Sequence, residues 1–150
     1  MPARPVTVLY HADCPDGFGA AYAAWLRFGA GARYRAMHHG QPWKMAEIAG
    51  HEVFILDFSF APDVLEAIAG LAGPVVQIDH HASARQPWAD WLGKSPDGAE
   101  IFRHPALPLT VIFDLGKSGV RLAWEHFHPD RPVPLVLRHV EDVDLWRFAL

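Results

Sequence analysis

Three continuous apolar runs constrain the fold of this chain more than any other feature of its sequence. Residues 6–10, 53–56 and 75–78 read VTVLY, VFIL and VVQI, and segments of helix length lie between the later ones. Strands that are apolar throughout, rather than at alternate positions, are typical of a parallel sheet covered on both faces. The sequence therefore predicts an α/β fold with an open, mainly parallel sheet and helices on both faces.

Helical spacing, turn residues and caps predict the remaining elements. The expected helices cover residues 16–26, 61–71, 118–127 and 134–146. Two additional strands are expected at residues 32–37 and 109–113. Repeated Pro and Gly between residues 82 and 108 predict mostly loop there, with room for one short strand. No repeat or linker divides the chain, so residues 1–150 are expected to form one domain.

Composition limits the partners of the chain. A formal charge of -4 argues against a broad electrostatic grip on nucleic acid, so we expect no binding of extended duplexes. With neither an apolar run long enough to span a bilayer nor a leader-like N-terminus, we expect a soluble, cytoplasmic protein without membrane contact. Cys14 is the single cysteine, which excludes an internal disulfide and a thiolate-based zinc cage. We interpret Cys14 as a small packing residue.

Residues of the kind that bind metals follow each of the three apolar runs. His11 follows the first run, with Asp13 and Asp16 in the next loop; Asp57 follows the second; Asp79-His80-His81 ends the third. Ligands of open parallel sheets bind beyond the carboxyl ends of the strands, so these side chains are expected to meet at one edge. Several carboxylates in one place require cations, and carboxylates with imidazoles suit manganese, magnesium or zinc. The sequence therefore predicts a metal site at this edge.

Each of these residues also has a purely structural interpretation. Asp13 can form an Asx turn, Asp16 can cap a helix, and adjacent histidines in a chain with 10 histidines are often solvated. For the pair His38-His39 a loop or substrate-facing role is favoured over metal ligation. The joint occurrence of acids at three strand ends, with histidines at two of them, favours the metal site.

Two segments nearer the C-terminus carry polar residues at expected helix ends. Lys117 and Ser118 could place a cation and backbone amides beside a phosphate, with an ordinary N-cap at Ser118 as an equal alternative. Asp142 and Asp144 lie beside Trp146 and either form a solvated acidic helix end or contribute to the site.

Four segments together resemble, in order, the four motifs of DHH-family phosphoesterases: His11-Ala-Asp13-Cys-Pro-Asp16-Gly17, Asp57, Asp79-His80-His81 and Asp142-Val-Asp144-Leu-Trp146. The resemblance covers nearly all of the chain, as the N-terminal catalytic domain of that family. It implies a two-metal hydrolase that favours two Mn²⁺ ions, with Mg²⁺ or Zn²⁺ as alternatives. Family members usually continue into a second, substrate-binding domain, which we expect this chain to lack.

The resemblance implies a substrate and a set of metal ligands. The implied reaction is hydrolysis of a phosphodiester or phosphoanhydride in a short oligonucleotide or small nucleotide. Asp57 would bridge the two ions, Asp79 would support or help ligate them, and Asp144 would either support a ligand from behind or be structural. The implied metal ligands are His11, Asp13, Asp16, Asp57, Asp79, His80 and Asp142.

The resemblance implies catalytic and substrate-binding roles as well. His81 would face the scissile phosphate, acting with His80 and Asp57. The candidates for substrate binding are His81, His39, Lys117 and Ser118. The pyrophosphatase pattern, a histidine followed by aspartates four and six residues later, is not met, because those positions are Pro15 and Gly17. The alternative function is a non-catalytic nucleotide- or metal-binding module. The chain could also form a homodimer.

Overall fold

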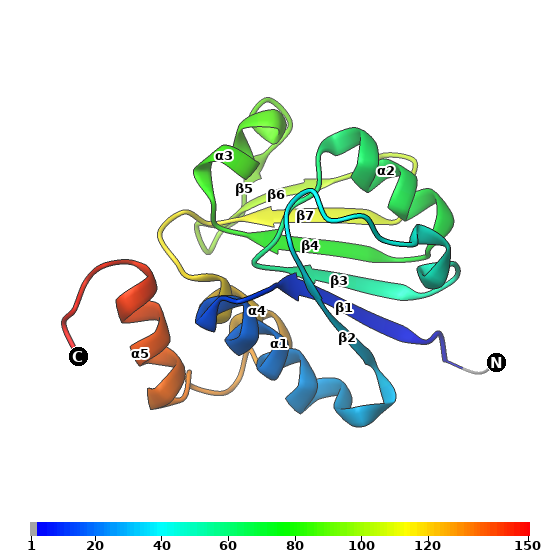
Figure 1. Ribbon diagram of the computed structural model, residues 1–150. Coiled ribbons are helices and arrows are strands. Elements are labelled where there is room, and N and C mark those ends of the chain that lie inside the picture. The colour runs from blue at the N-terminus through cyan, green and yellow to red at the C-terminus, as the bar shows by residue number, and fades with distance from the viewer. Residues whose placement is uncertain (1–2) are drawn as a thin grey trace.

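The computed structural model describes residues 3–150, which form one sheet with helices on both faces (Figure 1). The strands are β1 (Val6–His11), β2 (Arg33–Met37), β3 (Glu52–Leu56), β4 (Val75–Asp79), β5 (Gly93–Lys94), β6 (Glu100–Arg103) and β7 (Leu109–Phe113). The helices are α1 (Pro15–Phe28), α2 (Pro62–Leu71), α3 (Ala82–Arg85), α4 (Gly119–Phe127) and α5 (Leu135–Asp144), with 3₁₀ turns η1 (Gly29–Gly31), η2 (Met45–Ile48) and η3 (Gln86–Trp88). The expected α/β fold is confirmed.

The register of the sheet brings three strand ends to one edge. Within residues 3–150 the strand order is β2-β1-β3-β4-β7-β6-β5, and the first five of these strands run parallel to one another. Tyr10 pairs with Leu56, and Leu56 pairs with Ile78. The residues that follow these three, His11, Asp57 and Asp79, therefore lie side by side at this edge of the sheet.

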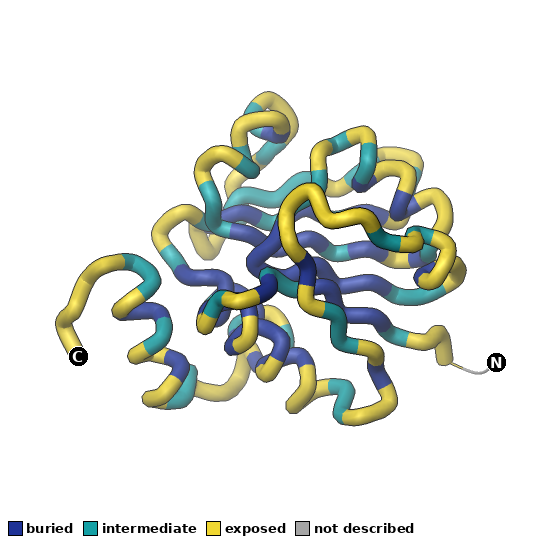
Figure 2. The backbone as a smooth tube through the Cα atoms, viewed as in Figure 1, coloured by how far each residue is buried: buried dark blue, intermediate teal, exposed yellow. Residues whose placement is uncertain are grey.

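The sheet separates two hydrophobic cores, and its central strands are buried on both faces (Figure 2). Val8 packs with α1 and α4, whereas its neighbour Leu9 packs with α2 and η3 on the other face, and both residues are fully buried. Successive side chains of a strand point to opposite faces. A strand covered on both faces therefore needs the continuous apolar sequence seen in β1, β3 and β4.

Residues 82–108 contain more regular structure than their sequence predicts. Helix α3 and turn η3 follow β4, and β5 and β6 form an antiparallel hairpin at the end of the sheet. Gly98 turns the hairpin with φ 92°, and Arg85 donates to both carboxylate oxygens of Glu100 at 2.7 and 2.6 Å. The Arg85–Glu100 contact joins separate elements, so the local Pro and Gly pattern could not indicate it.

Helices α1 and α4 pack closely because α1 presents small residues to its neighbour. Gly19, Ala20, Ala23 and Ala24 are all buried in α1. A Cβ atom on Gly19 would lie 2.8 Å from Cγ2 of Val120, so this contact requires glycine. Among residues 3–150, no helix combines the length and the apolar character needed to cross a membrane.

The Gly19 contact predicts that Gly19→Ala destabilises the protein. The added methyl group must displace the buried, β-branched Val120, and overpacking of this kind costs about 1–3 kcal/mol. Gly70→Ala is the matched control, because a Cβ atom there meets nothing within 4 Å and Gly70 lies inside α2. Alanine should stabilise α2 by about 0.5–1 kcal/mol. Urea unfolding measures both changes, and a Gly19→Ala protein as stable as the parent would contradict the packing described.

Candidate metal centre

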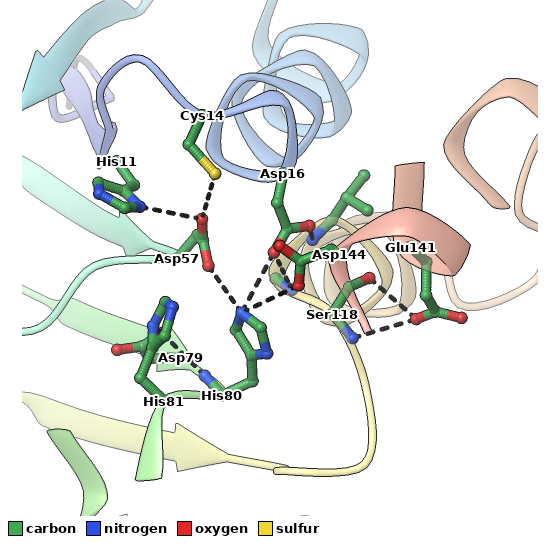
Figure 3. A network of polar contacts seen from close by, with 12 residues as sticks. His11, Cys14, Asp16, Asp57, Asp79, His80, His81, Ser118, Glu141 and Asp144 are labelled. Carbon is green, nitrogen blue, oxygen red and sulfur yellow. Dashed lines mark hydrogen bonds and ion pairs between the residues drawn. The ribbon is translucent and has the colours of Figure 1, made fainter. Parts of the chain in front are cut away.

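Asp57 lies at the middle of a polar cluster formed at the shared strand edge (Figure 3). Its Oδ2 atom is 3.5 Å from Nδ1 of His11 and 3.8 Å from Sγ of Cys14, and its Oδ1 atom is 3.0 Å from Nε2 of His80. Only 1% of the Asp57 side chain is exposed. Asp57 therefore connects the end of β1, the start of α1 and the end of β4.

The backbone at Asp57 is held in an unusual conformation. Its φ of 55° lies in the left-handed region, which costs a non-glycine residue about 1 kcal/mol or more. The backbone N–H of Asp57 donates to the carbonyl of Ile78 at 2.9 Å, which holds the turn against β4. Gly119 makes room for the side chain, because a Cβ atom there would lie 2.6 Å from Oδ1 of Asp57.

His80 forms a second junction, between Asp57 and the acids of two helices. Its Nε2 atom is 3.2 Å from Oδ2 of Asp16 and 3.6 Å from Oδ2 of Asp144. Asp16 is fixed from behind by the first amides of α4, since the N–H groups of Gly119 and Val120 donate to its two oxygens at 2.8 and 2.7 Å. The N-terminus of α4 thus binds a carboxylate of its own chain, as helix N-termini bind anions.

Asp79 supports His81 rather than the ring of His80. Oδ1 of Asp79 accepts from the backbone N–H of His80 at 2.8 Å and lies 2.7 Å from Nδ1 of His81, and Oδ2 accepts from Oγ of Ser59 at 2.6 Å. A carboxylate in this position fixes the tautomer and orientation of an imidazole. The side chain of His81 is 43% exposed, so it lies at the open rim of the cluster.

The charges of the cluster are balanced mainly by His80. Burial, together with the carboxylates of Asp16 and Asp79, raises the pKa of Asp57 to about 7, and the contact with His80 opposes this rise. Burial opposes protonation of His80, but the contacts with Asp16 and Asp57 outweigh it and raise the pKa of His80 to about 10. A divalent cation could supply the positive charge that protonated His80 supplies among these acids.

His11 offers a neutral nitrogen to the cluster. Burial lowers the pKa of His11, and the neighbouring His39 and His81 lower it further. Its Nδ1 atom is buried and has no hydrogen-bond partner among residues 3–150. A neutral imidazole with a buried, unsatisfied nitrogen is suited to bind a metal ion.

Three overlapping sets of side chains could hold a metal ion, and in each set the donor atoms lie within 4.8 Å of one another. The sets are Asp57, Asp79, His80 and His81; His11, Cys14 and Asp57; and Asp16, His80 and Asp144. Asp57 belongs to the first two sets and His80 to the first and third. Carboxylates and imidazoles with one sulfur fit divalent transition metals.

The structure corrects the choice of Asp142 over Asp144 as a ligand. The Asp142 carboxylate accepts from the backbone N–H groups of Ala149 and Leu150, at 2.9 and 3.3 Å, and so faces the C-terminal segment. Asp144 faces His80 instead. Residues two apart on a helix point in nearly opposite directions, so only one of the two acids can face the site.

Asp13 is also outside the three sets. Its side chain is 87% exposed and lies 3.4 Å from Nε2 of His38. Cys14, which we interpreted from the sequence as a packing residue, lies in the cluster instead, and the only sequence signal for it was its place in the loop three residues after the strand-end His11. His39 stacks on Phe58 with ring centroids 4.4 Å apart and lies beside His11 at the rim.

Ser118 is closed to a substrate, whereas Lys117 is partly exposed and forms an ion pair. Nζ of Lys117 donates to Glu125 at 2.8 Å, and Ser118 is fully buried. Ser118 caps α4, because its Oγ accepts from the N–H of Arg121, and it donates to Oε2 of Glu141 at 2.9 Å. Substrate binding by Ser118 is therefore corrected to a structural role, the N-cap at Ser118 is confirmed, and substrate binding by Lys117 stays a prediction.

Comparisons with known proteins add one relative. No protein-family model matches this chain, and no solved structure matches it. The chain is 31% identical, over an alignment of 157 residues, to uncharacterized protein R106 of Acanthamoeba polyphaga mimivirus. The alignment includes 95% of this chain and 34% of the viral protein, so the chain spans about a third of the length of the relative it matches.

The tight contact between Gly119 and Asp57 predicts that Gly119→Ala weakens metal binding. The new Cβ would push the Asp57 carboxylate out of position, and disturbing a ligand in this way costs about 10–100-fold in metal affinity. Gly31→Ala is the control, since a Cβ atom there meets nothing within 4 Å. Calorimetric titration with Mn²⁺ and Zn²⁺ measures the effect. Equal affinities in the parent and Gly119→Ala proteins would show that Asp57 is not a ligand.

Glu141 provides a prediction about pH. Burial opposes its ionisation, but bonds from Ser118 and Arg121 outweigh burial and bring the pKa of Glu141 below its ordinary value of 4.5. The resulting stability is therefore present above about pH 4.5 and is lost as pH falls through the lowered pKa. At pH 7, Glu141→Gln should destabilise the protein by about 2 kcal/mol through weaker charged hydrogen bonds.

The control for this effect is Glu47→Gln, which removes an exposed ion pair with Arg35 and should change stability by less than about 1 kcal/mol. Unfolding free energies from pH 7 down to pH 3 test the account. The difference between the parent and Glu141→Gln proteins should shrink towards low pH, and a difference that stays constant would contradict it.

Proposed function

We propose that this chain is the catalytic core of a metal-dependent phosphoesterase that hydrolyses a short oligonucleotide or small nucleotide. The proposal rests on one observation: Asp57 and His80 each belong to two neighbouring sets of donor atoms. Two-metal phosphoesterases need ions about 3.5–4 Å apart, and shared ligands favour that spacing. The cluster thus has the composition and the connectivity that such a site requires.

The convergence of distant segments supports the same proposal. His11, Asp16, Asp57 and His80 come from three segments that resemble DHH-family motifs, and Asp144 comes from the fourth. Figure 3 places all five side chains in one network. A chance resemblance spread along the sequence would not require its polar residues to meet in space.

His81 is suited to move a proton at the rim of the site. Its contact with Asp79 raises the pKa of His81, so the ring carries a proton more readily. Because Asp79 contacts Nδ1, the second nitrogen, Nε2, is the one left to face a phosphate or a leaving oxygen. Divalent cations bound beside it would activate water and offset the charge of the reacting phosphate. Acid catalysis of this kind contributes about 10²–10⁴-fold to the rate.

A cavity beside the cluster favours an organic phosphate ester over inorganic pyrophosphate. It has a volume of about 370 Å³ and lies between the start of α1 and one side of α5. Its lining is mostly apolar, and the acids Asp16 and Asp144 lie in its wall. A nucleoside or another flat organic group joined to a bound phosphate could enter this cavity, whereas a pyrophosphate ion would gain nothing from it.

An assay with short oligonucleotides tests the proposal. The chain with Mn²⁺ should hydrolyse di- to pentanucleotides above a control with chelator. Asp57→Asn should abolish turnover, and His81→Gln should lower kcat by about 10²-fold or more through the loss of proton transfer. Asp63→Asn, at the exposed start of α2, should leave turnover unchanged.

Calorimetry beside this assay separates the proposal from a non-catalytic metal-binding module. Metal binding without turnover at any nucleotide concentration would reject the enzyme and favour the binding module. Turnover that survives Asp57→Asn would reject the site assigned to it.

A further inference from the structure

Cys14 directs its sulfur into the candidate metal centre (Figure 3). The Sγ atom lies 3.8 Å from Oδ2 of Asp57, and the same oxygen is 3.5 Å from Nδ1 of His11. These three side chains form one of the sets whose donor atoms all lie within 4.8 Å. Asp57 is the deeply buried member, with 1% of its side chain exposed. The sulfur therefore lies where a third ligand to a shared ion would be needed.

The backbone between β1 and α1 selects Cys14 over Asp13 for this position. Asp13 has φ 52°, a left-handed turn that sends its carboxylate outward to His38. Cys14 is then extended, with φ -135° and ψ 124°, and its side chain returns towards Asp57. Because of this turn, the sulfur of Cys14 faces the site, and the carboxylate of Asp13, which the sequence pattern favours as a ligand, does not.

The N-cap position of α1 does not by itself require a cysteine. Cys14 occupies the N-cap position of α1, but its side chain makes no capping hydrogen bond. Ser, Thr, Asp and Asn are the residues that stabilise this position, by accepting a bond from the first turn of the helix. The residue is also only partly buried, so it does not fill the core.

The buried ring nitrogen of His11 supports the same assignment. Its Nδ1 atom is buried and lacks a hydrogen-bond partner among residues 3–150. A buried nitrogen without a hydrogen bond destabilises the folded protein. This nitrogen of His11 lies beside the same Asp57 oxygen that the sulfur approaches. An ion held by Cys14, His11 and Asp57 would satisfy this nitrogen.

We propose that Cys14 is a metal ligand and makes the set His11, Cys14 and Asp57 selective for thiophilic divalent ions, Zn²⁺ above Mn²⁺. This inference rests on the proposed metal centre. Soft sulfur ligands favour zinc, imidazole also suits zinc, and carboxylate oxygens suit manganese or magnesium. On binding, the S–H bond breaks, the proton goes to solvent and the sulfur lone pair binds the ion. The set Asp16, His80 and Asp144 has two carboxylates and no sulfur, so it should bind Mn²⁺ better relative to Zn²⁺ than the cysteine-containing set does.

Titration of the full 150-residue chain with Co²⁺ tests this assignment. Cys14 is the single cysteine, so a thiolate-to-cobalt charge-transfer band in the near ultraviolet can come from no other residue. The parent protein should show this band. Cys14→Ser should lose the band and at least about 100-fold in Zn²⁺ affinity, since even the partners of ligands contribute 10–100-fold. Its Mn²⁺ affinity should change by less than about 10-fold.

Asp13→Asn is the matched control and should keep both the band and the Zn²⁺ affinity. Three results would overturn the inference: no band from the parent protein, a Cys14→Ser protein that keeps its Zn²⁺ affinity, or an Asp13→Asn protein that loses it. The result is separable from the proposed function. A band without phosphoester turnover supports Cys14 and rejects the enzyme, and Mn²⁺-dependent turnover without a band does the reverse.

Discussion

The contact between Asp57 and His80 is the interaction on which the polar edge of this structure depends. It joins two strand ends and links the acid set of α1 and α5 to the set around His11. Buried carboxylates repel one another unless a positive charge lies among them. The carboxylates around His80 stabilise its protonated form, and the pKa of His80 is raised for that reason. The same electrostatic demand makes the edge a place where a divalent cation would be stabilised.

Two glycines and the N-terminus of α4 allow the acidic side chains to lie this close to His80. Gly119 lets Asp57 approach the first turn of α4, and the amides of that turn fix Asp16. A Cβ atom on Gly17 would lie 2.3 Å from the carbonyl oxygen of His11, so α1 can begin close to β1. The helices are thereby held close enough to the sheet for their acids to reach His80.

The strand-end residues and Asp16 at the start of α1 were predictable from the sequence, and the roles of Cys14 and Asp144 were not. Asp57 and His80 follow apolar runs, so their shared edge followed from the parallel sheet alone. The choice of Asp144 over Asp142 depends on how α5 is rotated, which packing decides. Cys14 replaces Asp13 because of one left-handed turn, and no local pattern indicates that conformation for aspartate.

The central claim is that this cluster binds divalent cations through Asp57 and His80. Anomalous diffraction from crystals grown with Mn²⁺ or Zn²⁺ tests it most directly. The account predicts an anomalous peak within bonding distance, about 2.0–2.2 Å, of a carboxylate oxygen of Asp57 and of Nε2 of His80. Saturated crystals with no peak there, or with peaks only elsewhere on the surface, would contradict the account.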